Sequence, residues 1–316
     1  VPGLGPACSG RKWRLRAVSL GAMSEQPVAV VTGANSGIGR ATAVQLAREG
    51  MRVFATVRSA SKAEKLLAMA AAAGVTVELA ELDVADDESV QQGFAQILAA
   101  AGRVDHLVNS AGVGGNAVAE ECPSELYNSV FNINVTGAVR CSQQVLPGMR
   151  ERRAGTIVNI TSVAGRIAAL AQSPYVASKW ALEGVSEGMA QELAPFDVRV
   201  AIVEPGVTKS AIFAKNIDVP NSTGAYDAHY RNMFQFYAAG YLSATDPFEV
   251  AKVIHHSIVT DEPELRYAVS WAGPEMAALH DRIDHADWLE LGRIDDLDAY
   301  MTRFEEIFGV DIHTPG

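Results

Sequence analysis

The fold is decided by the stretch Val28–Gly39, which reads VAVVTGANSGIG. It opens on four consecutive apolar residues, as expected of a buried strand. A glycine-rich turn follows, and a helical pattern then continues to about Arg48. Glycine adopts backbone angles that a side chain forbids, and a helix that begins beside the turn directs its free N–H groups there. The stretch therefore predicts a strand, a helix and, between them, a phosphate-binding turn at Gly33, Asn35, Ser36, Gly37, Ile38 and Gly39.

The spacing of these glycines is G-x-x-x-G-x-G, which differs from the G-x-G-x-x-G of the common dinucleotide fingerprint. A tight turn without any ligand would use the same residues.

Short apolar runs alternate with longer helical segments from residue 28 to residue 270. Strands that alternate with helices form a parallel sheet covered on both faces, and ligands bind at the carboxyl ends of its strands. We therefore predict a doubly wound, Rossmann-like α/β fold with a seven-stranded parallel sheet. The predicted strands are 28–31, 52–57, 75–82, 104–108, 156–160, 198–203 and 267–270, and the predicted helices end near residue 48, cover 61–73 and 87–101, end near residue 152 and cover 174–193.

The chain has 316 residues, 48 % of them apolar, which is enough for one large α/β domain. No repeat or Gly/Ser linker divides it, so we predict a single domain over 23–316 with its core at 27–270. Residues 271–316 carry apolar positions at helical spacing and are expected to form a tail of two or three amphipathic helices. Residues 1–22 are expected to be a disordered leader, with a targeting peptide as the alternative.

The charge of the chain limits its partners. Residues 1–22 hold four basic residues and no acidic one, so the rest has 22 basic against 37 acidic residues, a net charge of −15. Such a body is a poor binder of nucleic acid or of an anionic membrane. No apolar run is long enough to span a membrane, and neither the three cysteines nor the histidines show a metal-binding spacing. These features predict a cytoplasmic protein without a metal ion.

The second predicted strand ends in Ala55-Thr56-Val57-Arg58-Ser59. An acidic residue at this place would bind the ribose hydroxyls of NAD(H) and repel a 2′-phosphate. The charged residue here is Arg58, whose guanidinium presents a fork of donors suited to a phosphate. NADP(H) is therefore favoured as the cofactor, with NAD(H) as the alternative. A solvated surface arginine would give the same pattern.

Tyr175 and Lys179 stand four residues apart, and so on one face of a predicted helix. A lysine ammonium beside a phenol favours the phenolate, which lowers the pKa of the tyrosine and lets it exchange protons nearer neutral pH. Ser162 follows the fifth strand, at the sheet edge where its hydroxyl can hydrogen-bond a carbonyl or alcohol oxygen. The Tyr-x-x-x-Lys spacing alone is common, and a solvated lysine on an amphipathic helix is the alternative.

Together these motifs resemble the short-chain dehydrogenase/reductase family in its compact one-domain branch. The resemblance covers about residues 27–270, and the motifs occur in the family's order at the ends of the predicted strands. They are Thr32–Gly39, Asp83-Val84, Asn109-Ser110-Ala111-Gly112, Asn134-Val135-Thr136-Gly137, Ser162, Tyr175 with Lys179, and Pro205-Gly206-Val207-Thr208.

The resemblance implies a role for each motif. Tyr175 would be the general acid/base, Lys179 would lower its pKa and hold the nicotinamide ribose, and Ser162 would polarise the substrate oxygen. Asn134 would hold a water molecule in a proton relay to Lys179. The implied cofactor contacts also include Asp83 and Val84 at the adenine, Asn109, Ala111 and Gly112 along the adenosine, and Pro205, Gly206, Val207 and Thr208 beside the nicotinamide.

Two positions depart from the family pattern. Ser110 stands where a second asparagine is common, and Glu204 precedes Pro205 where asparagine is frequent. The Glu-Pro-Gly sequence and the Arg58 ending look like those of members that act on steroids, retinoids and other bulky apolar alcohols or ketones. Glu204 itself is not assigned to the catalytic set.

Residues 209–245 are expected to form a lid over the substrate, and their aromatic side chains suit an apolar ligand. The alternative is that they form only the inner faces of two helices. These residues are Ile212, Phe213, Ile217, Tyr226, Tyr230, Met233, Phe234, Phe236, Tyr237 and Tyr241.

The resemblance implies an NADP(H)-dependent oxidoreductase that interconverts an alcohol and its ketone or aldehyde, and that assembles as a homodimer or homotetramer. Two other classes remain open. An epimerase or dehydratase on the same scaffold favours a different glycine spacing and a larger C-terminal domain. A non-catalytic nucleotide-sensing module often lacks the serine, tyrosine or lysine, all of which are present here.

Overall fold

The computed structural model describes residues 26–210, 219–280 and 282–314. The predicted leader, 1–22, lies outside the described residues, as do the predicted lid residues Ile212, Phe213 and Ile217.

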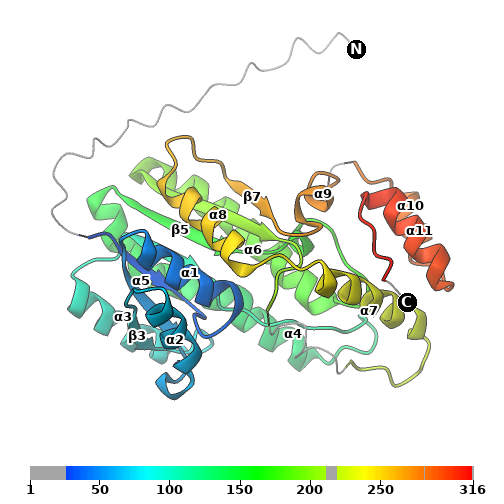
Figure 1. Ribbon diagram of the computed structural model, residues 1–316, viewed down its shortest axis with the longest axis horizontal. Coiled ribbons are helices and arrows are strands. Elements are labelled where there is room, and N and C mark those ends of the chain that lie inside the picture. The colour runs from blue at the N-terminus through cyan, green and yellow to red at the C-terminus, as the bar shows by residue number, and fades with distance from the viewer. Residues whose placement is uncertain (1–25, 211–218, 281, 315–316) are drawn as a thin grey trace, which may run out of the picture.

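One parallel sheet of seven strands forms the centre of the protein, in the order β3-β2-β1-β4-β5-β6-β7 (Figure 1). The predicted fold class is confirmed. The order reverses between β1 and β4, and in such sheets the crevice at the carboxyl ends of these strands is the ligand site. The strands are β1 (Val28–Val31), β2 (Arg52–Val57), β3 (Glu78–Glu81), β4 (His106–Asn109), β5 (Gly155–Ile160), β6 (Val198–Pro205) and β7 (Arg266–Val269).

Two layers of helices cover the sheet, because each helix turns an apolar stripe toward the strands. Helices α1, α2 and α8 pack on one face through residues such as Leu46, Leu66 and Ile254. Helices α3, α5 and the end of α6 pack on the other face through residues such as Phe94 and Met149. The helices are α1 (Gly37–Arg48), α2 (Glu64–Ala72), α3 (Asp87–Ala101), α4 (Ser124–Phe131), α5 (Gly137–Arg152), α6 (Ser173–Leu193), α7 (Asp227–Leu242), α8 (Pro247–Val259), α9 (Gly273–Ala277), α10 (His285–Leu291) and α11 (Leu297–Phe308).

The third strand is shorter than the predicted 75–82. It pairs with β2 only from Phe54↔Glu78 to Val57↔Glu81. The Val75 N–H instead donates to the carbonyl of Ala70 at 3.0 Å and closes the end of α2. The apolar run in the sequence therefore contains both the close of a helix and the start of a strand.

The long helical stretch predicted to end near Arg152 is continuous but not uniform. Between α4 and α5 the chain forms one π turn, η2 (Asn132–Thr136). Single π turns inside α-helices are rare and occur frequently at functional sites. Here the turn carries the predicted Asn134.

The predicted tail forms three helices, α9 to α11, which lie together at one end of the molecule beside α7 (Figure 1). Their apolar faces enclose a separate buried cluster that includes Tyr300, Phe304 and Phe308. The same cluster includes Val163 and Ile167, which directly follow Ser162 in the chain. A ring nitrogen of His280 also lies 2.6 Å from the carbonyl oxygen of Arg166. The tail is therefore packed against the segment that carries a predicted catalytic residue.

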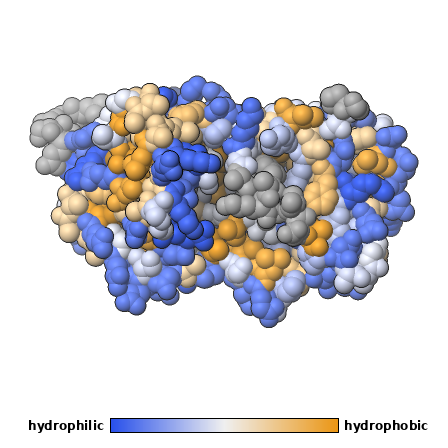
Figure 2. Space-filling model, turned by 60° about the horizontal axis from the view of Figure 1, so that its bottom comes forward, coloured by the Kyte–Doolittle hydropathy of each residue, from blue (hydrophilic) through white to orange (hydrophobic). Residues whose placement is uncertain are grey.

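The surface shown in Figure 2 carries hydrophobic residues as separate patches among hydrophilic ones. Within the described ranges, no helix has the length and apolar character needed to cross a membrane.

Candidate active site

The glycine turn is held by close backbone packing. Gly33 has a φ of +66°, and a Cβ there would lie 2.7 Å from the Cα of Ala111. A Cβ on Gly39 would lie 2.6 Å from the carbonyl oxygen of Gly33. The Thr32 hydroxyl oxygen accepts hydrogen bonds from the N–H groups of Ser110 and Ala111, at 3.0 and 3.1 Å. These contacts fix the turn against the end of β4 and leave no room for side chains at the glycines.

Helix α1 begins at Gly37, and the side chain of its N-cap residue, Ser36, makes no capping hydrogen bond. The helix therefore presents first-turn N–H groups and the positive end of its dipole at the turn. A Cβ on Gly37, whose φ is +51°, would lie 2.9 Å from the Cβ of Ser210, just after Thr208. The turn, the helix start and the segment after β6 thus border one space, and this arrangement fits the phosphates of a nicotinamide dinucleotide.

Arg58 is exposed at the end of β2 and makes no ion pair among the residues that the structure describes. The carboxylate nearest to this strand end in the register is Glu81, which pairs with Val57. Glu81 accepts a hydrogen bond from the Ala60 N–H at 2.5 Å. The strand end therefore combines an exposed guanidinium with a carboxylate that accepts one backbone hydrogen bond.

The predicted adenine residues lie at the end of β3. Asp83 accepts a hydrogen bond from the Ala85 N–H at 3.0 Å, so its side chain shapes this turn. Val84 is buried and packs so close to the start of α5 that a Cβ on Gly137 would lie 2.9 Å from it. Both residues thus have structural contacts in addition to the role that the family resemblance implies.

The side chain of Asn109 points into the protein rather than along the sheet edge. Its amide nitrogen donates to Asn159 at 2.9 Å and to Ser142 at 3.1 Å. Asn159 in turn donates to Ser186 at 2.8 Å. This buried network joins β4 and β5 to α5 and α6, and it leaves the backbone at Ala111 and Gly112 to border the ligand space.

Ser162, Tyr175 and Lys179 come together at the carboxyl ends of β5 and β6. Ser162 and Tyr175 share a side-chain hydrogen bond. The Ser162 hydroxyl also donates to the carbonyl of Pro205 at 3.3 Å and accepts from the Ala164 N–H at 3.1 Å. The Lys179 Nζ lies 5.7 Å from the centre of the Tyr175 ring. The three predicted groups therefore form one cluster.

The pKa values in this cluster are governed by burial. Burial lowers the pKa of Lys179 to about 8, and the nearby Glu183 carboxylate opposes this shift. Burial raises the pKa of Tyr175, and the hydrogen bond with Ser162 opposes that shift. The expected lowering of the Tyr175 pKa by the Lys179 charge stays a prediction, because burial is the larger influence on this phenol. The Lys179 ammonium donates to the carbonyl of Ile160 at 2.9 Å.

Both polar atoms of the Asn134 side chain are hydrogen-bonded. Its amide oxygen accepts from the Val113 N–H at 2.8 Å, and its nitrogen donates to the Val113 carbonyl at 2.9 Å and to Ser178 at 3.0 Å. A Cβ on Gly112 would lie 3.3 Å from the Asn134 Oδ1 and 3.8 Å from the Lys179 Nζ. Asn134 and Lys179 therefore both lie beside Gly112.

The segment Pro205–Thr208 is tied to the chain that follows β7. The Gly206 and Val207 N–H groups donate to the carbonyls of Val269 and Trp271, at 2.8 and 3.0 Å. A Cβ on Gly206 would lie only 2.1 Å from the Trp271 carbonyl oxygen, so glycine is required there. The Thr208 and Ser270 hydroxyls are 2.8 Å apart. These bonds fix the segment across the sheet edge from Ser162.

Helix α7 lies beside the cluster, where Tyr237 is near Tyr175. The Tyr237 hydroxyl donates to the Asn116 Oδ1 at 2.9 Å, and Tyr237 is near enough for a charge on Tyr175 to raise its pKa, although burial is the larger cause. Tyr230 accepts from the Val118 N–H at 3.1 Å. Tyr230 and Met233 form a buried apolar cluster with Val118. Asn116 carries no family motif in the sequence, and only the packing of α7 shows its position.

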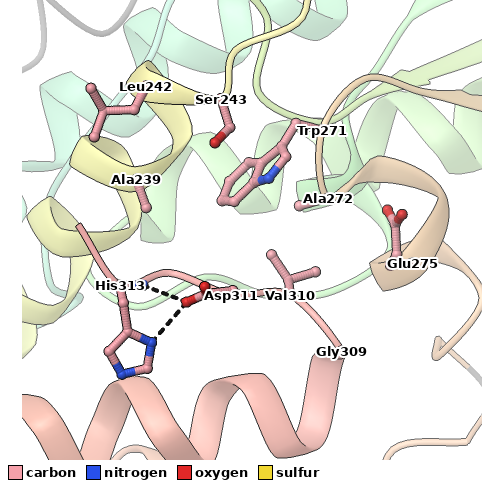
Figure 3. Close-up of a pocket in the computed structure, with 10 residues that line it drawn as sticks. All are labelled: Ala239, Leu242, Ser243, Trp271, Ala272, Glu275, Gly309, Val310, Asp311 and His313. Carbon is pink, nitrogen blue, oxygen red and sulfur yellow. Dashed lines mark hydrogen bonds and ion pairs between the residues drawn. The ribbon is translucent and has the colours of Figure 1, made fainter. Parts of the chain in front are cut away.

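A hollow lies between the end of α7 and the C-terminal tail (Figure 3). It has a volume of about 440 Å³ and is bordered by the end of α7, by Trp271 and by residues 309–313. Asp311 and His313 at its rim are bonded to each other. None of the predicted catalytic residues borders it, so we place the reaction at Ser162 and Tyr175 instead.

The fold and these contacts define a dinucleotide-binding α/β protein with a serine, a tyrosine and a lysine at the sheet edge. The family model for short chain dehydrogenases matches residues 27–219. The chain belongs to the short-chain dehydrogenase family of oxidoreductases.

Two relatives and one solved structure match the chain over most of its length. The chain is 37 % identical over 258 residues to retinol dehydrogenase 8 of Bos taurus, covering 77 % of this chain and 82 % of that protein. It is 35 % identical over 251 residues to 17-beta-hydroxysteroid dehydrogenase type 1 of Mus musculus, covering 76 % and 72 %. A solved structure of a variant of actinorhodin polyketide ketoreductase with NADPH is 31 % identical, with a TM-score of 0.67, and covers 76 % of this chain and 94 % of that one.

Proposed function

We propose that this protein is an NADP(H)-dependent oxidoreductase that interconverts a bulky apolar alcohol and its ketone or aldehyde. The observation that carries this proposal is the cluster of Ser162, Tyr175 and Lys179 beside the border formed by the glycine turn and Pro205–Thr208. Such a cluster places a proton donor and a hydrogen-bond donor at one reacting oxygen.

In the direction of reduction, Tyr175 protonates the substrate oxygen while Ser162 donates a hydrogen bond to the same atom. The nicotinamide, when bound, supplies the hydride to the carbonyl carbon. Lys179 holds its ammonium in the buried site between the Ile160 carbonyl and the Tyr175 ring. Its charge favours the phenolate that remains after the proton has left. Asn134 fixes the backbone at Val113, next to the path by which a proton can return.

The preference for NADP(H) rests on Arg58. Its guanidinium is exposed beside the turn that holds the phosphates, and the nearby Glu81 carboxylate is occupied by the Ala60 N–H. A 2′-phosphate on the adenosine would therefore meet the Arg58 cation directly after β2, where a carboxylate would stand in a site selective for NAD(H). The NADPH named with the related ketoreductase structure supports the same choice.

The apolar character of the substrate rests on the lining from α7. Tyr237, which is near Tyr175, packs against the buried cluster of Val118, Tyr230 and Met233. Retinol and hydroxysteroids, named for two relatives, are large apolar alcohols of the kind that this lining accepts. A panel of ketones, aldehydes and alcohols, monitored by nicotinamide absorbance, identifies the substrate class.

We propose also that the protein forms a homo-oligomer in the cytoplasm, as the family resemblance and the charge of the chain indicate. Trp180 on α6 is 43 % exposed and is one side chain that a second subunit would cover. Light scattering after gel filtration gives the oligomeric state directly.

The decisive variant is Tyr175→Phe. Loss of the phenolic proton should lower kcat by about 10²- to 10⁴-fold, while NADPH binding, measured by fluorescence or calorimetry, stays close to that of the wild type. Tyr127→Phe on α4 removes a hydroxyl outside the site and serves as the matched control. Full turnover in Tyr175→Phe would refute the assigned role of this residue.

A further inference from the structure

A group of buried charges lies directly behind the cluster of Ser162, Tyr175 and Lys179. Glu183 and Glu204 are 5 % and 2 % exposed. The Arg266 guanidinium lies 3.0 Å from Glu183 and 3.2 Å from Glu204, and Arg166 lies 3.9 Å from Glu204. Two carboxylates and two guanidiniums thus share a space with little water, where ionic interactions are stronger than at the surface.

This group touches each element that carries the site. Glu183 follows Lys179 by one turn on α6, Glu204 precedes Pro205 on β6, and Arg166 follows the Ser162 segment. A Cβ on Gly165 would lie 3.1 Å from both the Glu183 Cγ and the Lys179 carbonyl oxygen. The packing therefore fixes Glu183 against both the lysine turn of α6 and the segment after Ser162.

Not every buried polar atom of this group has a hydrogen-bond partner. Across the part of the chain that the structure describes, the Glu183 Oε1 and the Arg166 Nε are buried without a hydrogen-bond partner, whereas the Glu204 Oε1 is in ion-pair contact with Arg266. Buried polar groups left in this way are destabilising, and each such group in a native structure calls for an explanation. An electrostatic effect of this group on the neighbouring Lys179 provides such an explanation.

We propose that Glu183 is a positioning residue that acts through Lys179. Its carboxylate, held in place by Arg266, keeps the buried Lys179 ammonium protonated beside Tyr175. This inference rests on the proposed function, because it assigns a purpose to the charge on Lys179 in that reaction.

The electrostatics of the group agree with this role. Burial alone would lower the pKa of Lys179 further, and the Glu183 carboxylate is the group that opposes it. Five groups face Glu183: Lys179 on its own helix, Thr161 at the end of β5, Arg166 after η3 (Val163–Gly165), Glu204 on β6 and Arg266 on β7.

Glu204 is the weaker acid of the pair. Burial, together with the Glu183 charge, raises the pKa of Glu204 to about 7, while Arg166 and Arg266 oppose the shift. Below that pH Glu204 is largely neutral, and Arg266 is then free to neutralise Glu183. Burial raises the pKa of Glu183 as well, and Thr161 and Arg266 oppose that shift by favouring the ionised carboxylate.

The test measures the titration of Lys179 itself in the intact protein. The protein is labelled with ¹³C at the lysine ε carbons, and the Lys179 signal is identified by its loss in Lys179→Arg. Glu183→Gln should lower the titration midpoint of Lys179 by about one pH unit, because an opposite charge one helical turn away is removed. An unchanged midpoint in Glu183→Gln would overturn the proposal.

The chain offers a matched control on the same helix. Glu187 lies one turn after Glu183 and also bonds Arg266, at 2.5 Å, but its side chain is 52 % exposed. Glu187→Gln removes the same charge from the same guanidinium and should leave the Lys179 midpoint close to that of the wild type. Glu183→Asp keeps the charge and should restore most of the midpoint. If Glu183→Asp behaves as Glu183→Gln does, the group supports packing and not protonation.

The pH profile of kcat supplies a second measurement. The alkaline limb, where Lys179 loses its proton, should move to lower pH in Glu183→Gln by an amount similar to the shift in the midpoint. A purely structural role would lower kcat at every pH and leave the limb in place. The titration of Lys179 does not depend on turnover, so it stays informative even if Tyr175→Phe retains activity and the proposed function fails.

Discussion

The two halves of the sheet present their ligand sites in opposite ways. In the nucleotide half, from β1 to β4, the site is made of backbone: Gly33 and Gly39 bring the chain so close to its neighbours that no side chain fits. In the half from β5 to the tail, the site is made of side chains, and Ser162, Tyr175 and Tyr237 come from separate elements.

This difference predicts which substitutions each half of the sheet tolerates. A site made of backbone is damaged by adding atoms, whereas a site made of side chains is damaged by removing them. Both halves depend on contacts between distant parts of the chain, such as Gly37 with Ser210 in the nucleotide half and Tyr237 with Asn116 in the substrate half. Variants confined to one half should therefore leave the other half's binding constants unchanged.

Phe304→Ala is expected to have the largest effect and tests the dependence of the substrate half on the tail. Phe304 is buried and stacks 4.4 Å from Phe308, so its removal leaves a cavity that should lower the free energy of unfolding by about 3–5 kcal/mol. Denaturant unfolding measures the loss. Leu289→Ala, at a side chain that is 60 % exposed in the same tail, should change little. A weakened NADPH affinity in folded Phe304→Ala would break the separation of the halves.

Arg58→Asp is expected to have an intermediate effect, confined to the nucleotide half. Replacing the cation by an anion at the end of β2 removes charge-assisted bonds to a 2′-phosphate and adds an acceptor for ribose hydroxyls. The ratio of kcat/KM for NADPH to that for NADH should fall by about 100-fold, or ~2.7 kcal/mol. Arg150→Asp, an exposed position on α5, is the control for charge alone. Unchanged cofactor selectivity would discard Arg58 as the phosphate ligand.

Tyr237→Phe is expected to have the smallest effect, in the substrate half. It removes the hydrogen bond to Asn116, worth about 1 kcal/mol. The KM for the carbonyl substrate should rise about fivefold while the KM for NADPH stays constant. Tyr267→Phe removes a hydroxyl that accepts from the Glu264 N–H at an exposed position on the far sheet edge, and it should change neither constant. An equal rise in both KM values for Tyr237→Phe would mean that α7 serves the two halves together.

The same contrast explains what could be predicted from the sequence. The glycine turn, the seven strands and the Ser162, Tyr175 and Lys179 cluster were predictable because each depends on local spacing and on its place at a strand end. The direction of the Tyr175 pKa was not, because it depends on how deeply distant elements bury the phenol. Glu183 stands at helical spacing from Lys179, but only the fold shows that Arg266 and Glu204 meet it.

The π turn at Asn132–Thr136 adds one residue to the helical stretch from Ser124 to Arg152. A π turn holds one residue more than the α-helix would need for the same length. Removal of one residue from this turn would restore a regular helix from Ser124 to Arg152 without shortening it appreciably. It would leave the flanking helices in place but rebuild the turn that carries Asn134, whose side chain would then lose Val113 and Ser178. The extra residue of this turn therefore sets the direction of the Asn134 side chain.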